Sequence, residues 1–368
     1  MLREWASPDD ELIGLFERQG CLRVDTPILQ PAELFLDLSG EDIRRRLHLT
    51  QDGEGRELCL RPEYTIPICR RHIESGEPAG EYCYLGPVFR LRGDEAGEFL
   101  QAGFESIGRA DTAPADAEAI GAALDGVRVY TARALDTVVG DMGLMSALFD
   151  ALGIPAGLRR RLGRTLAAGQ DIRSVLRPPD EPGASDYSGL LAAIQGQDPT
   201  AARAFVEDVI SIAGISRVGG RSAGQIAERF LSRAENRSGA VSDKVQDVLG
   251  RYFAIRGDLD ESAREVRRLA RDCGLDLERS LRILEERTGF MAARGVEIGS
   301  LRFAADFVRS LDYYTGFVFE IRATEGPARQ VLAAGGRYDG LLAHLGASAP
   351  APGVGCSFWL DRLRGERP

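Results

Sequence analysis

Strand-like patterns lie at both ends of this chain, and a long stretch typical of helices separates them. Short apolar runs occur in two groups, at Cys21–Val24, Leu58–Leu60, Tyr82–Leu91 and Phe99–Gly108, and then at Ser300–Val308, Asp312–Ile321 and Ala351–Ser357. No repeated β-α-β unit connects them, which favours a mainly antiparallel sheet over a Rossmann fold. The sequence therefore predicts an α+β fold, an antiparallel sheet flanked by helices and interrupted by a helical insertion.

Helix signals complete this outline. Ser7-Pro8-Asp9-Asp10 is typical of a capped helix start, and Gly20 of its end. A second helix is expected at about Thr65–Glu74. From about Ala115 to Arg294 most of the chain has the amphipathic pattern of helices, as at Ala201–Ile212, Ser242–Phe253 and Leu277–Thr288. We expect residues 1–150 and 296–368 to form one discontinuous core, with 151–295 as a mostly helical insertion.

Composition excludes several classes of protein. The net charge of −10 argues against a large nucleic-acid surface. The six cysteines form no C-x-x-C pair and the three histidines lie far apart, so no metal site is expected. No apolar run reaches the roughly 18 residues of a membrane span, and no secretory leader is visible, so we expect a cytoplasmic protein. Lys244 is the only lysine among 46 basic residues, so a single arginine carries little information.

One predicted strand places polar side chains on a shared face. In the segment 99–106, alternation puts Leu100, Ala102 and Phe104 on one face. Gln101, Gly103 and Glu105 share the other, where Gly103 leaves space above the sheet. This face could line a pocket, but the pattern alone favours a solvated face of an antiparallel sheet.

Two further segments carry groups suited to a ligand. Glu63 and Thr65 lie where a strand turns into a helix, a place where acceptors can meet an ammonium group. The alternative is structural, with Thr65 as N-cap and Glu63 in the field of the helix dipole. The segment 308–316 clusters a cation, a carboxylate and two phenols. The Gly335-Gly336 pair allows close backbone approach, although such a pair is usually only a turn.

Taken together, these segments resemble histidyl-tRNA synthetase. The similarity covers roughly residues 1–150 and 296–368, in the same order. Its most specific part is the run from Ser310 to Glu320, SLDYYTGFVFE. The resemblance implies a class II synthetase-like core with a pocket for histidine. Glu63, Thr65 and Gln101 would hold the α-amino group, and Arg90 and Arg309 would face the carboxylate. The imidazole would be read by Glu105 and Tyr314, with Tyr313 lining the site.

The chain departs from the synthetase pattern where that enzyme holds ATP. Arg92 stands in place of a glutamate that helps to fix adenine, and the loop Leu91–Glu98 is short. Trp359 replaces a glycine beneath ATP, and an indole buries about 150–250 Å², so we expect it to fill nucleotide space. Only six residues follow Arg362, so no anticodon-binding domain is expected.

This combination is similar to the regulatory subunits of ATP phosphoribosyltransferase. The resemblance implies a chain with no catalysis and no cofactor of its own. It would activate a short-form catalytic subunit in the first step of histidine biosynthesis and mediate feedback by L-histidine. A self-dimer within the hetero-oligomer is expected, without tRNA or membrane. Two alternatives stay open: a minimal histidine-activating enzyme that transfers histidine to a non-tRNA acceptor, and a structural paralog with a vestigial pocket.

Overall fold

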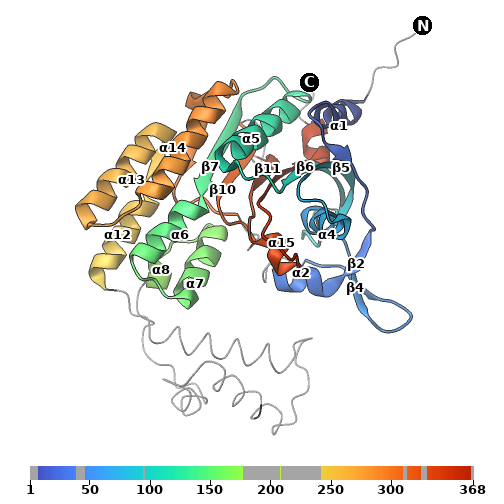
Figure 1. Ribbon diagram of the computed structural model, residues 1–368, viewed down its shortest axis with the longest axis horizontal. Coiled ribbons are helices and arrows are strands. Elements are labelled where there is room, and N and C mark those ends of the chain that lie inside the picture. The colour runs from blue at the N-terminus through green and yellow to red at the C-terminus, as the bar shows by residue number, and fades with distance from the viewer. Residues whose placement is uncertain are drawn as a thin grey trace. The chain divides into compact units, whose positions relative to one another are not determined.

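A nine-stranded sheet organises the computed structural model (Figure 1), which describes residues 7–38, 46–93, 96–176, 208, 242–309, 313–324 and 330–365. The strand order is β1-β5-β6-β12-β11-β10-β7-β9-β8. Its strands are β1 (Leu22–Arg23), β5 (Gly80–Phe89), β6 (Glu98–Ile107), β7 (Leu135–Asp141), β8 (Arg256–Gly257), β9 (Leu301–Ala304), β10 (Phe317–Ala323), β11 (Val331–Arg337) and β12 (Gly353–Trp359). All neighbours are antiparallel except the pairs β1–β5 and β7–β9, which confirms the predicted sheet type.

Strands from the two ends of the chain alternate within this sheet. β12 pairs with β6, and β10 pairs with β7, so late strands lie beside early ones (Figure 1). A separate three-stranded sheet has the order β2-β4-β3. Its strands are β2 (Leu29–Pro31), β3 (Leu49–Gln51) and β4 (Glu57–Leu60).

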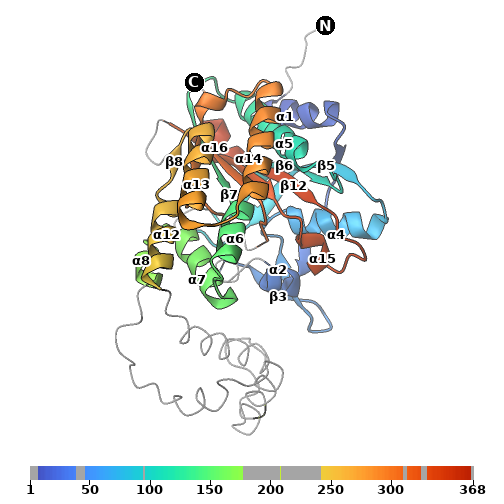
Figure 2. The same cartoon turned by 60° about the vertical axis from the view of Figure 1, so that its left-hand side comes forward.

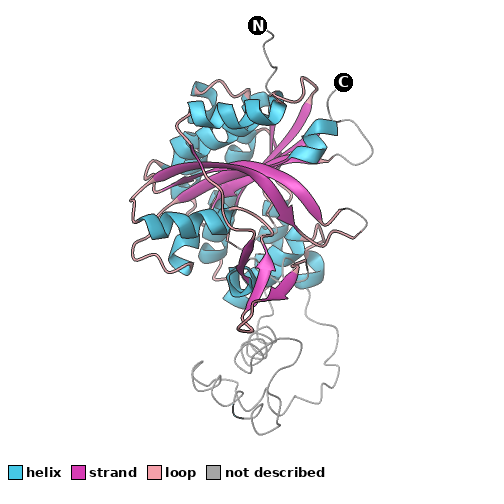
Figure 3. Ribbon diagram, turned by 90° about the vertical axis from the view of Figure 1, so that its right-hand side faces the viewer, coloured by secondary structure: helices cyan, strands magenta, loops and turns pink. Residues whose placement is uncertain are grey.

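Helices lie on both faces of the large sheet (Figure 3). The helices of the described chain are α1 (Pro8–Arg18), α2 (Ala32–Leu38), α4 (Thr65–Ser75), α5 (Thr112–Arg128), α6 (Met142–Ala151), α7 (Ala156–Ala167), α8 (Arg173–Leu176), α12 (Asp243–Phe253), α13 (Leu259–Cys273), α14 (Glu278–Ala293), α15 (Leu341–His344) and α16 (Leu360–Gly365), with a 3₁₀ turn at Ile298–Ser300. α1 packs on β5, and α5 on β11 and β12, whereas α4 contacts β6 and α15. α13 and α14 lie side by side, and α14 packs on α5 (Figure 2). None of these described helices is both long and apolar enough to cross a lipid bilayer.

Local signals placed the first helices correctly. Ser7 Oγ accepts a hydrogen bond from the Asp10 amide at 3.2 Å, and Asp10 Oδ2 accepts one from the Ser7 amide at 3.3 Å. This reciprocal pair is the predicted capping box of α1. The helix expected at Ser242–Phe253 is α12, and the one at Leu277–Thr288 corresponds to α14. The helix expected at Ala201–Ile212 falls outside the described residues.

β7 corrects the prediction of a largely helical stretch after Ala115. Leu135–Asp141 is a central strand between β10 and β9, and its last five residues are buried. A strand covered on both faces shows no polar alternation, so periodicity could not reveal it. The Gly335-Gly336 pair likewise lies inside strand β11 rather than in a turn.

Four buried charged side chains join α5, α14, β7 and β11. Asp116 accepts hydrogen bonds from Arg337 Nε at 2.7 Å and from Arg287 Nε at 2.9 Å. Arg287 Nη1 also donates to Asp141 at 2.9 Å. Each charge meets an opposite one, which is the condition under which ions can be buried. We call Asp116, Asp141, Arg287 and Arg337 the ion cluster.

The chain forms two compact units, Met1–Ala151 with Arg251–Pro368, and Leu152–Gly250. The sheets belong to the first unit. In the second, Arg161 of α7 donates to the Val175 carbonyl of α8 at 3.5 Å. The compact unit with the sheets includes residues 251–295, which we had placed in the insertion; the division into core and insertion stays a prediction.

Candidate functional site

The face of β6 that carries Gln101 and Glu105 is buried, and each of these side chains is only 1% exposed. Their cross-strand neighbours are Gly86 and Trp359 for Gln101, and Tyr82 and Gly355 for Glu105. The solvated-face alternative is therefore wrong. The opposite face is apolar, as predicted, and the Phe104 and Phe16 ring centroids lie 5.0 Å apart.

Glu105 is held by two hydroxyl groups. Thr65 Oγ1 donates to its Oε1 at 2.6 Å, and the Tyr338 hydroxyl donates to Oε2. Gly355 makes room for this carboxyl group, because a Cβ atom there would overlap with Oε2. Burial raises the pKa of Glu105 to about 8, helped by the nearby Glu63 and opposed by the two hydroxyl donors.

Glu63 caps the N-terminus of α4. Its carboxylate accepts hydrogen bonds from the Thr65 amide at 2.7 Å and from the Ile66 amide at 3.0 Å. The expectation that Thr65 is the N-cap is wrong, since Thr65 is the first helical residue and its hydroxyl points to Glu105. Burial raises the pKa of Glu63, whereas the Ile66 amide and the charge of Arg90 oppose that rise.

Two arginines share the other side of the pocket. Arg90 Nε donates to the Pro62 carbonyl at 2.6 Å, and Arg309 Nη1 donates to Glu320. Burial lowers the pKa of Arg90, and the charge of Arg309 lowers it further, whereas Glu63 raises it. The two guanidinium groups are thus close enough to repel each other.

Two polar atoms in this region are buried without a hydrogen-bond partner among the described residues. They are Oε1 of Gln101, an acceptor, and Nε of Arg309, a donor. Buried polar groups are normally satisfied, so unsatisfied ones call for an explanation. An acceptor and a donor of this kind are complementary to the ammonium and carboxylate groups of an amino acid.

The two tyrosines after Arg309 lie beside these groups. The rings of Tyr313 and Tyr314 are 4.9 Å apart, and Tyr313 meets Tyr338 edge to face at 6.0 Å. The charge of Arg309 acts on Tyr314, and those of Glu63 and Glu105 act on both tyrosines. Hydrogen bonds or electrostatic contacts therefore link seven predicted residues, Glu63, Thr65, Arg90, Glu105, Arg309, Tyr313 and Tyr314, and Gln101 shares the sheet face with Glu105.

Sequence reasoning missed Tyr338 and Tyr84. Tyr338 follows β11, and only the pairing of distant strands brings its hydroxyl to Glu105. Tyr84 fills the space above Gly103, where a Cβ atom would overlap with the phenol oxygen. Its hydroxyl lies 2.8 Å from Ser357 Oγ. We call the buried residues from Glu63 to Tyr338 described above the pocket.

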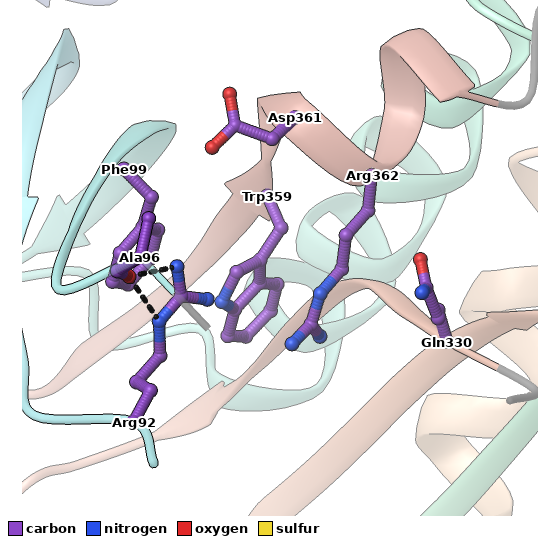
Figure 4. A pocket seen from close by; sticks show the side chains of 7 residues that line it. All are labelled: Arg92, Ala96, Phe99, Gln330, Trp359, Asp361 and Arg362. Carbon is purple, nitrogen blue, oxygen red and sulfur yellow. Dashed lines mark hydrogen bonds between the residues drawn. The ribbon is translucent and has the colours of Figure 1, made fainter. Parts of the chain in front are cut away.

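An open cavity of about 350 Å³ lies farther along the same sheet face (Figure 4). Arg92 and Arg362 line it on either side of the Trp359 indole, together with Phe99. The Arg92 guanidinium lies 3.7 Å from the centroid of the Phe99 ring, and that of Arg362 lies 5.6 Å from Trp359. Arg92 also donates two hydrogen bonds to the Ala96 carbonyl. Trp359 thus borders a hollow beside its ring.

Comparisons with known proteins agree with this architecture. The histidyl-tRNA synthetase family profile matches residues 3–205 and 229–363. A solved structure of an ATP phosphoribosyltransferase regulatory subunit/histidyl-tRNA synthetase from Bacillus halodurans superimposes with a TM-score of 0.68, at 21% identity, covering 98% of this chain and 78% of that one. The apo histidyl-tRNA synthetase of S. aureus gives a TM-score of 0.56 at 19% identity, covering 97% and 67% of the two chains. These likenesses establish the class II synthetase-like fold.

Curated relatives are closer in sequence. The ATP phosphoribosyltransferase regulatory subunit of Brucella anthropi is 41% identical over 348 residues, covering 93% of this chain and 92% of its own length. That of Brucella canis is 40% identical with the same coverage. The fold and these relatives together show that the chain belongs to the ATP phosphoribosyltransferase regulatory subunit family, a branch of the histidyl-tRNA synthetase fold.

Proposed function

We propose that this chain binds L-histidine in the pocket and, as a non-catalytic subunit in the cytoplasm, passes that signal to a short-form ATP phosphoribosyltransferase catalytic subunit. The observation that carries the proposal is the pair of unsatisfied atoms, an acceptor on Gln101 and a donor on Arg309. Glu63 and Arg90 place an anion and a second cation beside them. Zwitterionic amino acids need this combination, whereas a purely apolar ligand would leave all four groups unsatisfied.

Recognition of the side chain follows from Glu105. Its carboxyl group is fixed by Thr65 and Tyr338, so it can meet an imidazole without reorganising. In this proposal the catalytic partner carries out the chemistry, and the chain supplies an activating surface and a histidine-responsive state, with two copies of itself in the complex. Feedback of this kind requires that the two states of the assembly differ in their affinity for histidine.

Two experiments test the proposal. At a histidine concentration 100-fold above the dissociation constant, binding should stabilise the isolated chain by roughly 2.7 kcal/mol, seen as a rise of the melting temperature. Co-expression with a short-form catalytic subunit should yield a hetero-oligomer whose transferase activity needs this chain and falls when histidine is added. A chain that neither responds to histidine nor changes transferase activity would favour the structural paralog with a vestigial pocket.

The alternative of a histidine-activating enzyme is separated by its chemistry. The proposal expects no exchange between pyrophosphate and ATP in the presence of histidine, and no charging of tRNA. The substitutions at Arg92 and Trp359, in the cavity next to the pocket, support this expectation. Robust exchange by the purified chain alone would overturn the regulatory role.

A further inference from the structure

Glu320 is a buried carboxylate in the middle of the sheet and outside the predicted set of ligand contacts. It lies on β10, between Val138 of β7 and Ala334 of β11, and is 5% exposed. A buried carboxylate requires charged or hydrogen-bonding partners. Glu320 has two: Oε2 accepts from Arg309 Nη1, and Oε1 accepts from Arg322.

The two arginines differ in where they lie. Arg309 belongs to the pocket and its side chain is 15% exposed, whereas that of Arg322 is 37% exposed. A guanidinium group is planar and carries its donors in a fixed fork. Holding Nη1 of Arg309 therefore also fixes the direction of Nε, which is the buried donor without a partner.

Charge balance explains why Arg309 needs such an anchor. Arg309 lies near Arg90, and the two cations disfavour each other in a buried site. Glu63 acts on Arg90, and Glu320 contacts Arg309. Without Glu320, the favourable response of Arg309 would be to turn away from Arg90. The second cation would then no longer face the ligand.

We propose that Glu320 is a positioning residue that makes the pocket selective for ligands with a carboxylate group. Its carboxylate clamps Arg309 through Nη1, and Nε then points to the carboxylate of the bound amino acid. Arg322 sits on the other oxygen of Glu320 and offsets its second lone-pair side from the exposed edge. This inference rests on the histidine-binding function proposed above, and assigns to Glu320 no contact with the ligand.

The test compares L-histidine with histamine, which has the same ring and ammonium group but no carboxylate. Calorimetric titration of the full-length chain gives the ratio of the two dissociation constants. Glu320→Gln removes the charge and keeps the size, so histidine binding should weaken by about tenfold or more, with histamine binding little changed. A merely structural role would weaken both ligands together.

A matched control and a second variant complete the design. Arg322→Ala removes the other cation on Glu320 and should keep the selectivity for histidine. Glu320→Asp keeps the charge but shortens the reach, and it decides the question if Glu320→Gln does not fold; it should also lose selectivity. Unchanged selectivity in the folded Glu320 variant, or equal loss in Arg322→Ala, would overturn the role of Glu320. Failure of the unsubstituted chain to prefer histidine over histamine would instead count against the proposed function.

Discussion

The pocket and the open cavity lie on the same face of the same two strands, yet their polar groups are satisfied in different ways. β6 supplies Gln101 and Glu105 to the pocket and Phe99 to the cavity, and β12 supplies Gly355 and Trp359. α4 and Tyr338 cover the pocket, and two polar atoms stay unsatisfied inside it. In the cavity, arginines rest on aromatic rings and backbone carbonyls. Enclosure, more than residue type, separates a site prepared for a ligand from a surface that already satisfies itself.

The largest expected effect comes from the reverse side of the pocket strand. Phe104→Ala should destabilise the fold by about 3–5 kcal/mol, because Phe104 packs against Phe16 on the face away from the pocket. Urea unfolding measures the loss. Histidine affinity of the folded fraction should stay unchanged, and a selective loss of binding would mean that the strand faces the other way.

Glu105→Ala should have the opposite profile. Removing the carboxyl group is expected to weaken histidine binding by about 1.5–3 kcal/mol, the value of a hydrogen bond to a charged group. Stability should fall by less than in Phe104→Ala, which serves as the matched control one residue away. If titration calorimetry gave equal histidine affinities for Glu105→Ala and the unsubstituted chain, Glu105 would have no role in recognising the ring.

The buried acid also predicts a pH dependence without ligand. The pKa of Glu105 is raised from 4.5 to about 8 in the folded chain, so between these values the folded state holds a proton that the unfolded state has lost. Stability should therefore fall as pH rises through this window, by at most about 1.4 kcal/mol per pH unit for this group. Urea unfolding at several pH values measures the slope. Glu105→Gln should flatten it, and equal slopes for the two chains would contradict the assignment to Glu105.

The smallest expected effect lies in the cavity. Trp359→Gly enlarges the hollow between Arg92 and Arg362 but adds no group that could hold phosphate. Adenylate formation depends on precise placement, since a shift of about 1 Å can cost 10²-fold in rate. We therefore expect no pyrophosphate exchange in this variant, as in the unsubstituted chain. Exchange restored by this single change would show that the cavity is a nucleotide site closed by one side chain.

Sequence predicted the features that depend on near neighbours. The capping box of α1 and the alternation at residues 99–106 involve residues a few positions apart, and both are confirmed. The alternation could not tell a pocket from a solvated face, because burial comes from α4 and from Tyr338. Tyr338 itself meets Glu105 across 233 positions of the chain, a contact that only strand pairing creates.

Charge partners were also hidden from the sequence. With 46 basic residues in the chain, no local pattern could select Glu320 as the partner of Arg309. The family resemblance supplied the eight predicted pocket residues, and the structure brings seven of them into mutual contact or electrostatic reach. Their role in binding histidine stays a prediction.

The end of β11 belongs to both sides of the sheet. Arg337 enters the ion cluster with Asp116, and the next residue, Tyr338, reaches Glu105 in the pocket. Consecutive residues of an extended segment point to opposite faces, so neither side chain can be displaced without moving the other. Genetic suppressors of weakened histidine binding are therefore to be sought on α5 and α14, around Asp116 and Arg287, in helices that never touch the ligand.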